Sequence, residues 1–522
     1  MKPIKMKNPF YVIFLASLLA FCNCACAQNT IKIEAKGIAN QEIYLANYYG
    51  NKLYYNDTTL ADSKGIATFA GKTFDECGKY AVVFPGPQVF DILVAEEEIY
   101  IKTTADSPAK NINVVKSVNN KVFYDYLSFI ASRKDDRAPI DACLTDSLNS
   151  DADKEPCRAE LKKMNENVVA HQKKIVEDNK DRLVGKIIKM ALDVEVPEDI
   201  LKLGEEDPLV QYYWYRKHYW DNVDKTDPRL VRDQMFHRLL DKYYTKILPQ
   251  IPDTLANEAI KLVDSFENYD MTKYTTHYVT YSSETSNIMC MDKVFVKMVN
   301  KYYRTGKADW LDEEQMAKVL ESADKKENVQ CGEVITNVIL PDTTLNNWVS
   351  LHDVDAKYTV VAIWESTCGH CKKEMPALVD LYHNYKDKGL AVYAIGNDFE
   401  TEPWIEFIDE YKLDWINVSD NPQINQADSA SKLIYSGITT LKSLNFRTTF
   451  DVFSTPKLFL LDFEKRIIGK QLSAEQIEEI IVRKEEGTSD VKEEEQDEEI
   501  IKKASNSEGD LKKSKEKKSK KS

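Results

Sequence analysis

The stretch WESTCGHCKKEMP, residues 364–376, decides the fold of the C-terminal third of this chain. A continuous apolar run, Tyr358–Trp364, leads into it, and residues 372–386 carry apolar side chains at helical spacing. Two more apolar runs follow at residues 389–396 and 457–461. Buried strands that alternate with helices in this way predict an α/β domain whose sheet is covered on both faces.

Two cysteines, Cys368 and Cys371, stand where the first strand passes into the helix. Disulfide exchange needs a thiolate that attacks a disulfide and a second thiol that resolves the mixed disulfide. We expect Cys368 to be the nucleophile, because the helix dipole and the unpaired N–H groups at the helix start stabilise its thiolate. Cys371, farther inward, is then the resolving thiol. His370 adds a donor or a positive charge beside the thiolate, which favours the dithiol and makes the disulfide a stronger oxidant.

Further elements of the C-terminal third match a known family. They are the strand ending Ala362-Ile363-Trp364, the Cys368-Gly369-His370-Cys371 pair, Glu374, Pro376, and Ser454-Thr455-Pro456 before the run at 457–461. With them, residues 331–483 resemble a thioredoxin-fold module of the TlpA/ResA type, the extracytoplasmic thiol:disulfide oxidoreductases. The resemblance implies an enzyme without a cofactor that acts on protein thiols and disulfides, with a membrane electron donor as a further partner.

The resemblance also implies roles for three residues around the dithiol. The Thr455–Pro456 bond is expected to be cis and to lie against the active-site sulfurs, so that Thr455 presents backbone groups to an extended substrate. Glu374 matches an acid that assists proton transfer, and its alternative role is that of a helix-surface carboxylate. The redox direction stays open, because isomerase pairs have potentials of about −180 mV and thioredoxin has a potential of about −270 mV.

Two features depart from the family pattern. Many relatives carry an aromatic residue just before the first cysteine, whereas this chain has Thr367, and residues 423–447 are longer than a minimal thioredoxin needs. The longer segment is either a helical insertion or a mobile loop. The sequence leaves two alternative functions: a peroxiredoxin-like thiol peroxidase, because Ser366 and Thr367 precede Cys368, and a binding or scaffold protein with a vestigial dithiol.

The pattern upstream of the dithiol changes twice, which predicts a multidomain chain. Residues 28–110 alternate with period two between turn signals and predict a β-sandwich. Residues 111–328 have helical periodicity and predict an all-α domain, followed by the thioredoxin-like domain at 329–483. Residues 484–522 form acidic and basic blocks and predict a disordered tail. The upstream regions more loosely resemble accessory regions of envelope proteins of the Bacteroidetes.

An aromatic cluster within the helical region has two interpretations. Tyr212-Tyr213-Trp214-Tyr215, with Tyr219 and Trp220, is either a platform for aromatic or sugar ligands or the packing stripe of buried helices, and packing is favoured.

The first residues read as an export signal, residues 1–27. Three lysines in the first seven residues precede twelve apolar or small residues, 10–21, and Ala25-Cys26-Ala27 supplies a cleavage pattern before Gln28. This predicts a periplasmic protein; the alternative is a lipoprotein processed at Cys22 or Cys26 and tethered to the outer membrane. Removal of the three lysines changes the formal charge from −15 to −15 − 3 = −18, so a nucleic-acid partner is not expected.

The ten cysteines indicate disulfides rather than a metal site. Outside the signal, only Cys368 and Cys371 form a Cys-x-x-Cys, and no second ligand pair for zinc accompanies them, so no metal is expected. In an oxidising compartment, Cys143 with Cys157 and Cys290 with Cys331 could pair, but these four cysteines allow three pairings. Cys77 is left over and is expected to be a buried apolar residue.

Overall fold

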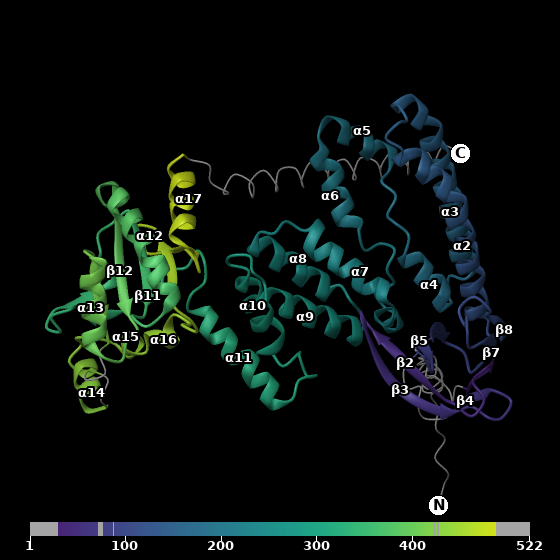
Figure 1. The fold of residues 1–522 in the computed structure, drawn as a ribbon, viewed down its shortest axis with the longest axis horizontal. Coiled ribbons are helices and arrows are strands. Elements are labelled where there is room, and N and C mark those ends of the chain that lie inside the picture. The colour runs from purple at the N-terminus through teal and green to yellow at the C-terminus, as the bar shows by residue number, and fades with distance from the viewer. Residues whose placement is uncertain (1–29, 71–76, 87, 421–423, 425–426, 487–522) are drawn as a thin grey trace, which may run out of the picture. The chain divides into compact units, whose positions relative to one another are not determined.

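The computed structural model describes residues 30–70, 77–86, 88–420, 424 and 427–486 (Figure 1). The expected signal peptide at 1–27 and residues 487–522 of the expected tail lie outside them. The chain divides into two compact units. One holds the described residues up to Glu206 together with Trp214–Tyr243 and Phe266–Met271, and the other holds Asp207–Tyr213, Tyr244–Ser265 and the described residues from Thr272 onward.

The first unit begins with a β-sandwich. Its strands are β1 (Thr30–Lys36), β2 (Glu42–Tyr49), β3 (Lys52–Leu60), β4 (Ile66–Ala70), β5 (Gly78–Phe84), β6 (Gln88–Val94), β7 (Glu98–Thr104) and β8 (Asn113–Lys116). Within the described residues they form two four-stranded sheets, ordered β4-β1-β7-β8 and β3-β2-β5-β6. Alternate side chains of both sheets, such as Ile33 and Leu45, meet in one apolar core. The predicted sandwich is confirmed, and its strands continue to Lys116, beyond the limit expected at residue 110.

The middle of the chain is helical, as its periodicity predicts. Its helices are α2 (Val118–Thr145), α3 (Asp151–Asp178), α4 (Leu183–Met190), α5 (Glu198–Glu206), α6 (Pro208–His218), α7 (Gln234–Lys242), α8 (Pro252–Asp264), α9 (Tyr269–Glu284), α10 (Asp292–Met298) and α11 (Glu313–Glu327), with shorter helical turns at Pro228–Arg232, Tyr243–Ile247 and Val299–Tyr303. Helices α2 and α3 form a long hairpin that the Cys143–Cys157 disulfide closes.

The aromatic cluster of this region is a packing element. Tyr219 and Trp220 are buried, at 4% and 5% exposure. The Trp220 ring lies edge-on to Tyr243 and to Phe266, with centroid separations of 5.5 and 6.0 Å. Aromatic pairs at these distances stabilise a core, so the favoured interpretation holds for these two rings.

The C-terminal domain is built on a mixed five-stranded sheet of order β13-β12-β11-β14-β15. Its strands are β11 (Tyr358–Trp364), β12 (Leu390–Gly396), β13 (Ile416–Ser419), β14 (Lys457–Leu461) and β15 (Ile467–Lys470), and β9 (Ile339–Pro341) and β10 (Trp348–Ser350) form a separate pair. Strands β11, β12 and β13 run parallel, whereas β14 is antiparallel to β11. The three apolar runs of the sequence are therefore strands, with one of them reversed.

Helices cover both faces of this sheet, as predicted. They are α12 (Gly369–Tyr385), α13 (Thr401–Tyr411), α14 (Ala427–Tyr435), α15 (Leu441–Leu444), α16 (Phe446–Thr449) and α17 (Ala474–Glu485). Side chains of α12, α13 and α17 pack on one face, and those of α15 and α16 pack on the other. Of the two alternatives for residues 423–447, the helical insertion is the one observed for the part that the structure describes.

The structure gives the pairing of the cysteines and corrects the expectation for Cys77. Cys143 pairs with Cys157 and Cys290 pairs with Cys331, which is one of the three pairings that the sequence allows. The expectation for Cys77 is wrong: it is half-buried and disulfide-bonded rather than a buried free residue. Disulfide pairing depends on distance in space, which the spacing of cysteines along the chain does not reveal.

Candidate active site

The two thiols lie at the start of α12, immediately beyond the central strand. Strand β11 ends at Trp364, and after a three-residue loop Cys368 is the residue that caps the helix. Its sulfur accepts a hydrogen bond from the backbone N–H of Cys371 at 3.3 Å. Cys368 is partly exposed, whereas Cys371 is completely buried, and both are free thiols. The dithiol is thus asymmetric: one sulfur is accessible and the other is enclosed.

The Thr455–Pro456 turn lies against the accessible sulfur. Because β14 is antiparallel to β11 and Lys457 pairs with Ile363, the residues just before β14 lie beside the loop that carries Cys368. The Cys368 thiol donates a hydrogen bond to the carbonyl oxygen of Thr455 at 3.1 Å. The Thr455–Pro456 bond is cis, as the resemblance implies.

The surroundings of the two sulfurs push their pKa values apart. Partial burial alone would raise the pKa of Cys368, but hydrogen bonds from the Cys371 thiol, the Thr455 side chain and the backbone N–H groups of Cys371 and His370 outweigh it and lower the pKa. Burial, with the hydrogen bond to Cys368, raises the pKa of Cys371 to about 12. Such a pair presents one activated nucleophile and keeps the second sulfur protonated.

The other two expected site residues lie on α12 in different settings. The His370 side chain is exposed, and the backbone N–H of the residue is the part that acts on Cys368. Glu374 is half-buried, and its Oε1 accepts a hydrogen bond from the backbone N–H of Ala474 at 2.6 Å. Since Ala474 is the first residue of α17, this carboxylate caps that helix. Neither of the two roles considered for Glu374 in the sequence includes this contact.

A buried carboxylate behind the loop is a site residue that sequence reasoning missed. Asp398 follows β12, and its carboxylate accepts hydrogen bonds from the backbone N–H of Ser366, at 3.0 and 3.2 Å, and from the Ser366 hydroxyl. Both residues are buried. Burial, and then repulsion from Glu365, raises the pKa of Asp398 despite these bonds. The signal that could have found it is topological: β11 and β12 are parallel, and they end side by side at Trp364 and Gly396.

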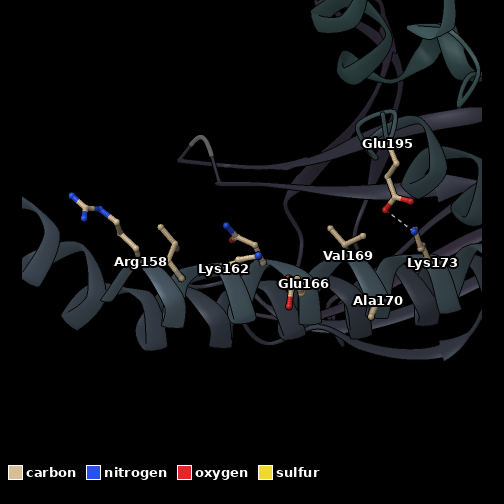
Figure 2. Close-up of a pocket in the computed structure, with 9 residues that line it drawn as sticks. Arg158, Lys162, Glu166, Val169, Ala170, Lys173 and Glu195 are labelled. Atoms are coloured by element: carbon tan, nitrogen blue, oxygen red, sulfur yellow. Dashed lines mark hydrogen bonds and ion pairs between the residues drawn. The ribbon is translucent and has the colours of Figure 1, made fainter. Parts of the chain in front are cut away.

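A hollow elsewhere in the chain lacks redox groups. It lies in the first unit along α3, has a volume of about 650 Å³ and is lined by side chains such as Arg158, Lys162 and Val169. Figure 2 shows the ion pair at one end, where Lys173 meets Glu195 at 2.6 Å. Across the part of the chain that the structure describes, no three His, Cys, Asp or Glu side chains are grouped to hold a metal ion.

Two segments of the chain match known protein families. Residues 331–467 match the AhpC/TSA family, and residues 156–326 match a domain of unknown function, DUF5106. The first match covers the mixed sheet up to the start of β15, together with both thiols. Residues 331–467 carry a thioredoxin-like domain of the AhpC/TSA family.

Relatives of the C-terminal domain include thiol–disulfide oxidoreductases. The thiol-disulfide oxidoreductase ResA of Oceanobacillus iheyensis is 40% identical over 65 residues, which span 12% of this chain and 34% of that protein. ResA of Bacillus cereus is 26% identical over 156 residues, which span 30% of this chain and 77% of that protein. A solved domain of a possible thiol-disulfide isomerase from Cytophaga hutchinsonii is 33% identical, with 31% of this chain and 96% of that domain covered and a TM-score of 0.25. The AhpC/TSA match and the ResA relatives indicate a C-terminal domain of the thiol–disulfide oxidoreductase type, and large β and helical regions precede it in the chain.

Proposed function

We propose that this protein exchanges disulfides with protein substrates outside the cytoplasm through Cys368 and Cys371. The observation that carries the proposal is the asymmetry of the dithiol: an accessible sulfur with a lowered pKa beside a buried sulfur whose pKa is about 12. The thiolate of the first attacks a substrate disulfide, forms a mixed disulfide and releases one substrate thiolate. The buried sulfur then loses its proton and attacks the first sulfur, which releases the second substrate thiolate and leaves the enzyme as a disulfide. Two electrons pass to the substrate, and the reverse sequence oxidises it.

The remaining site residues support this cycle. Thr455 holds the accessible sulfur through its carbonyl oxygen and lies where an extended substrate segment would pair. The His370 side chain, between the two cysteines in the chain, is exposed, and we retain it as a residue that contacts the substrate. Glu374 is one turn beyond Cys371 on α12, and we retain it as an acid that assists transfer of the Cys371 proton.

The test uses two variants of the full chain in a protein-disulfide reduction assay. Cys368→Ser should abolish turnover, and Cys371→Ser should accumulate a mixed disulfide with the substrate that a thiol reductant releases. Full activity in the Cys368 variant would exclude the proposed chemistry. The same samples incubated with peroxide and a thiol donor test the peroxidase alternative, which requires peroxide to be consumed at a rate that depends on Cys368.

The location and the electron source are part of the proposal. The basic and apolar residues at 1–27 favour export to the periplasm, with Gln28 as the mature N-terminus or with a lipid on Cys22 or Cys26. Among the residues that the structure describes, no helix is long and apolar enough to cross a bilayer. A membrane thiol donor would supply electrons if the pair works as a reductase. Mass analysis of the mature N-terminus distinguishes the two forms of export, and the measured potential of the pair decides its direction.

A further inference from the structure

Three loops share the edge of the sheet at which Cys368 lies. Strands β11 and β12 are parallel and end opposite each other, at Trp364 and Gly396. Strand β14 is antiparallel to β11 and begins at Lys457, opposite Ile363. The loops that follow β11 and β12 and the loop that precedes β14 therefore meet at the same edge. Two of these loops carry a phenylalanine that faces solvent.

Phe453 is in the loop before β14 and is 98% exposed. Its neighbours on both sides are held in place: Val452 packs against the core beneath the sheet, and the Thr455 carbonyl oxygen accepts the hydrogen bond from Cys368. The ring thus belongs to a short segment whose two ends, Val452 and Thr455, are held by contacts. The ring is therefore an apolar surface two residues from the carbonyl oxygen that contacts Cys368, in the loop that borders the site.

Phe399 is in the loop after β12 and is 75% exposed. It follows Asp398, whose carboxylate holds Ser366 two residues before Cys368. The guanidinium of Arg447 lies 5.9 Å from the Phe399 ring, and an ion pair with Asp420 at 2.6 Å fixes that arginine. Contacts of this kind orient the ring at the edge of the site without covering it.

We propose that Phe399 and Phe453, the aromatic rim, bind bulky apolar side chains next to the cysteine of an extended polypeptide substrate. The inference rests on the proposed exchange function and adds its substrate preference. Both rings lie in loops at the edge of the sheet where a substrate sulfur must reach Cys368, so a chain that reacts there passes along these loops. The residue just before Cys368 is Thr367, which has no aromatic ring. Its hydroxyl donates a hydrogen bond to Glu365. The apolar contact surface of this chain is therefore supplied by two other loops.

The test compares two peptides that differ only beside a single cysteine: one has Phe and Leu there, and the other has Gly and Ser. Each cysteine carries a nitrothiobenzoate group as a mixed disulfide. The Cys368 thiolate attacks the peptide sulfur, a peptide–Cys368 disulfide forms, and the released thiolate is measured by its absorbance. We expect reduced wild-type protein to react about tenfold faster with the apolar peptide, which corresponds to burying one large apolar side chain.

The variants Phe399→Ser and Phe453→Ser, alone and combined, should reduce this preference toward equal rates. Phe463→Ser is the matched control, because Phe463 is 68% exposed but follows the opposite end of β14, where Leu461 pairs with Thr359. This control should keep the full preference. Phe463→Ser should also react with the symmetrical small disulfide of nitrothiobenzoate at the wild-type rate, which shows that the dithiol of the control is intact. In the rim variants the readout is the ratio of the two peptide rates, because this ratio does not depend on the absolute reactivity of the dithiol.

The outcomes separate the rim from the underlying function. Equal wild-type rates with both peptides, or an unchanged preference in the combined rim variant, would refute the rim. If the wild-type protein reacted with none of the three compounds, that is, neither peptide nor the small disulfide, the exchange function itself would be refuted. Loss of the preference in Phe463→Ser as well would also refute the rim, because the effect would then follow surface apolarity rather than place.

Discussion

Iodoacetamide at pH 7 should modify Cys368 of the reduced full-length protein and leave Cys371 intact. The pKa of Cys371 is about 12 and that of Cys368 lies below the ordinary value of 9.0, so they differ by at least 12 − 9 = 3 units. The thiolate population of Cys368 is then at least about 1,000 times larger. A thiolate of higher pKa is the stronger nucleophile, which returns a factor of about 20 to Cys371. The net preference is about 50-fold, and the complete burial of Cys371 increases it.

The assay is a timed reaction with iodoacetamide followed by peptide mass analysis, which separates the two sites although they are three residues apart. The rate at Cys368 should rise with pH to a plateau, with a midpoint below about 9, because the reactive form is the thiolate. The Cys368→Ser variant is the control, and its remaining thiol should stay unmodified over the same interval. Comparable rates at both cysteines of the wild type, or a midpoint well above 9, would refute the assignment of nucleophile and resolving thiol.

Three further predictions concern protein stability. The raised pKa of Asp398 means that the folded protein keeps this proton to higher pH than the unfolded chain does. The unfolding free energy should therefore fall as pH rises from about 4 through the raised pKa, and Asp398→Asn should remove this pH dependence in denaturant titrations. Glu374→Ala should lower the stability of the domain by about 1 kcal/mol, because the hydrogen bond from the backbone N–H of Ala474 is lost. Glu374→Gln should keep this stability but lose turnover, because an amide accepts the same bond and cannot transfer a proton. Thermal midpoints measure the first effect and reaction rates the second. Removal of the Cys290–Cys331 bridge should cost about 4 kcal/mol and removal of Cys143–Cys157 about 3 kcal/mol, because their sequence separations are 41 and 14 residues; denaturation of the two double Cys→Ser variants compares them.

Local sequence patterns predicted much of the secondary structure and the fold class. The apolar run Tyr358–Trp364 is β11 with the same bounds, and the run at 457–461 is β14. Period-two alternation identified the β-sandwich, and helical spacing identified the region after it. These predictions succeed because strands and helices repeat their buried side chains at fixed intervals along the chain. The same patterns did not reveal that β14 runs antiparallel to β11, since that direction depends on the path of the connecting segments.

Contacts between residues far apart in the chain could not be predicted from the sequence. Asp398 holds Ser366 from 32 residues away, and Glu374 bonds to Ala474 across 100 residues. Cys77 was expected to be a free buried residue and is disulfide-bonded. For Asp398 and Glu374 the partner is determined by the pairing of strands or the packing of helices, and no local spacing encodes it.

By itself, the sequence determined the chemistry of this protein: two cysteines one helical turn apart at the end of an apolar strand. That information is local, because a helix that begins between the cysteines places both sulfurs at its N-terminus. Tertiary structure alone decided which sulfur is accessible, by burying Cys371 under the sheet-facing side of α12 and setting the Thr455 carbonyl oxygen against Cys368. It also decided what surrounds the nucleophile, since Phe399 and Phe453 reach its edge only through the register of β12 and β14 with β11.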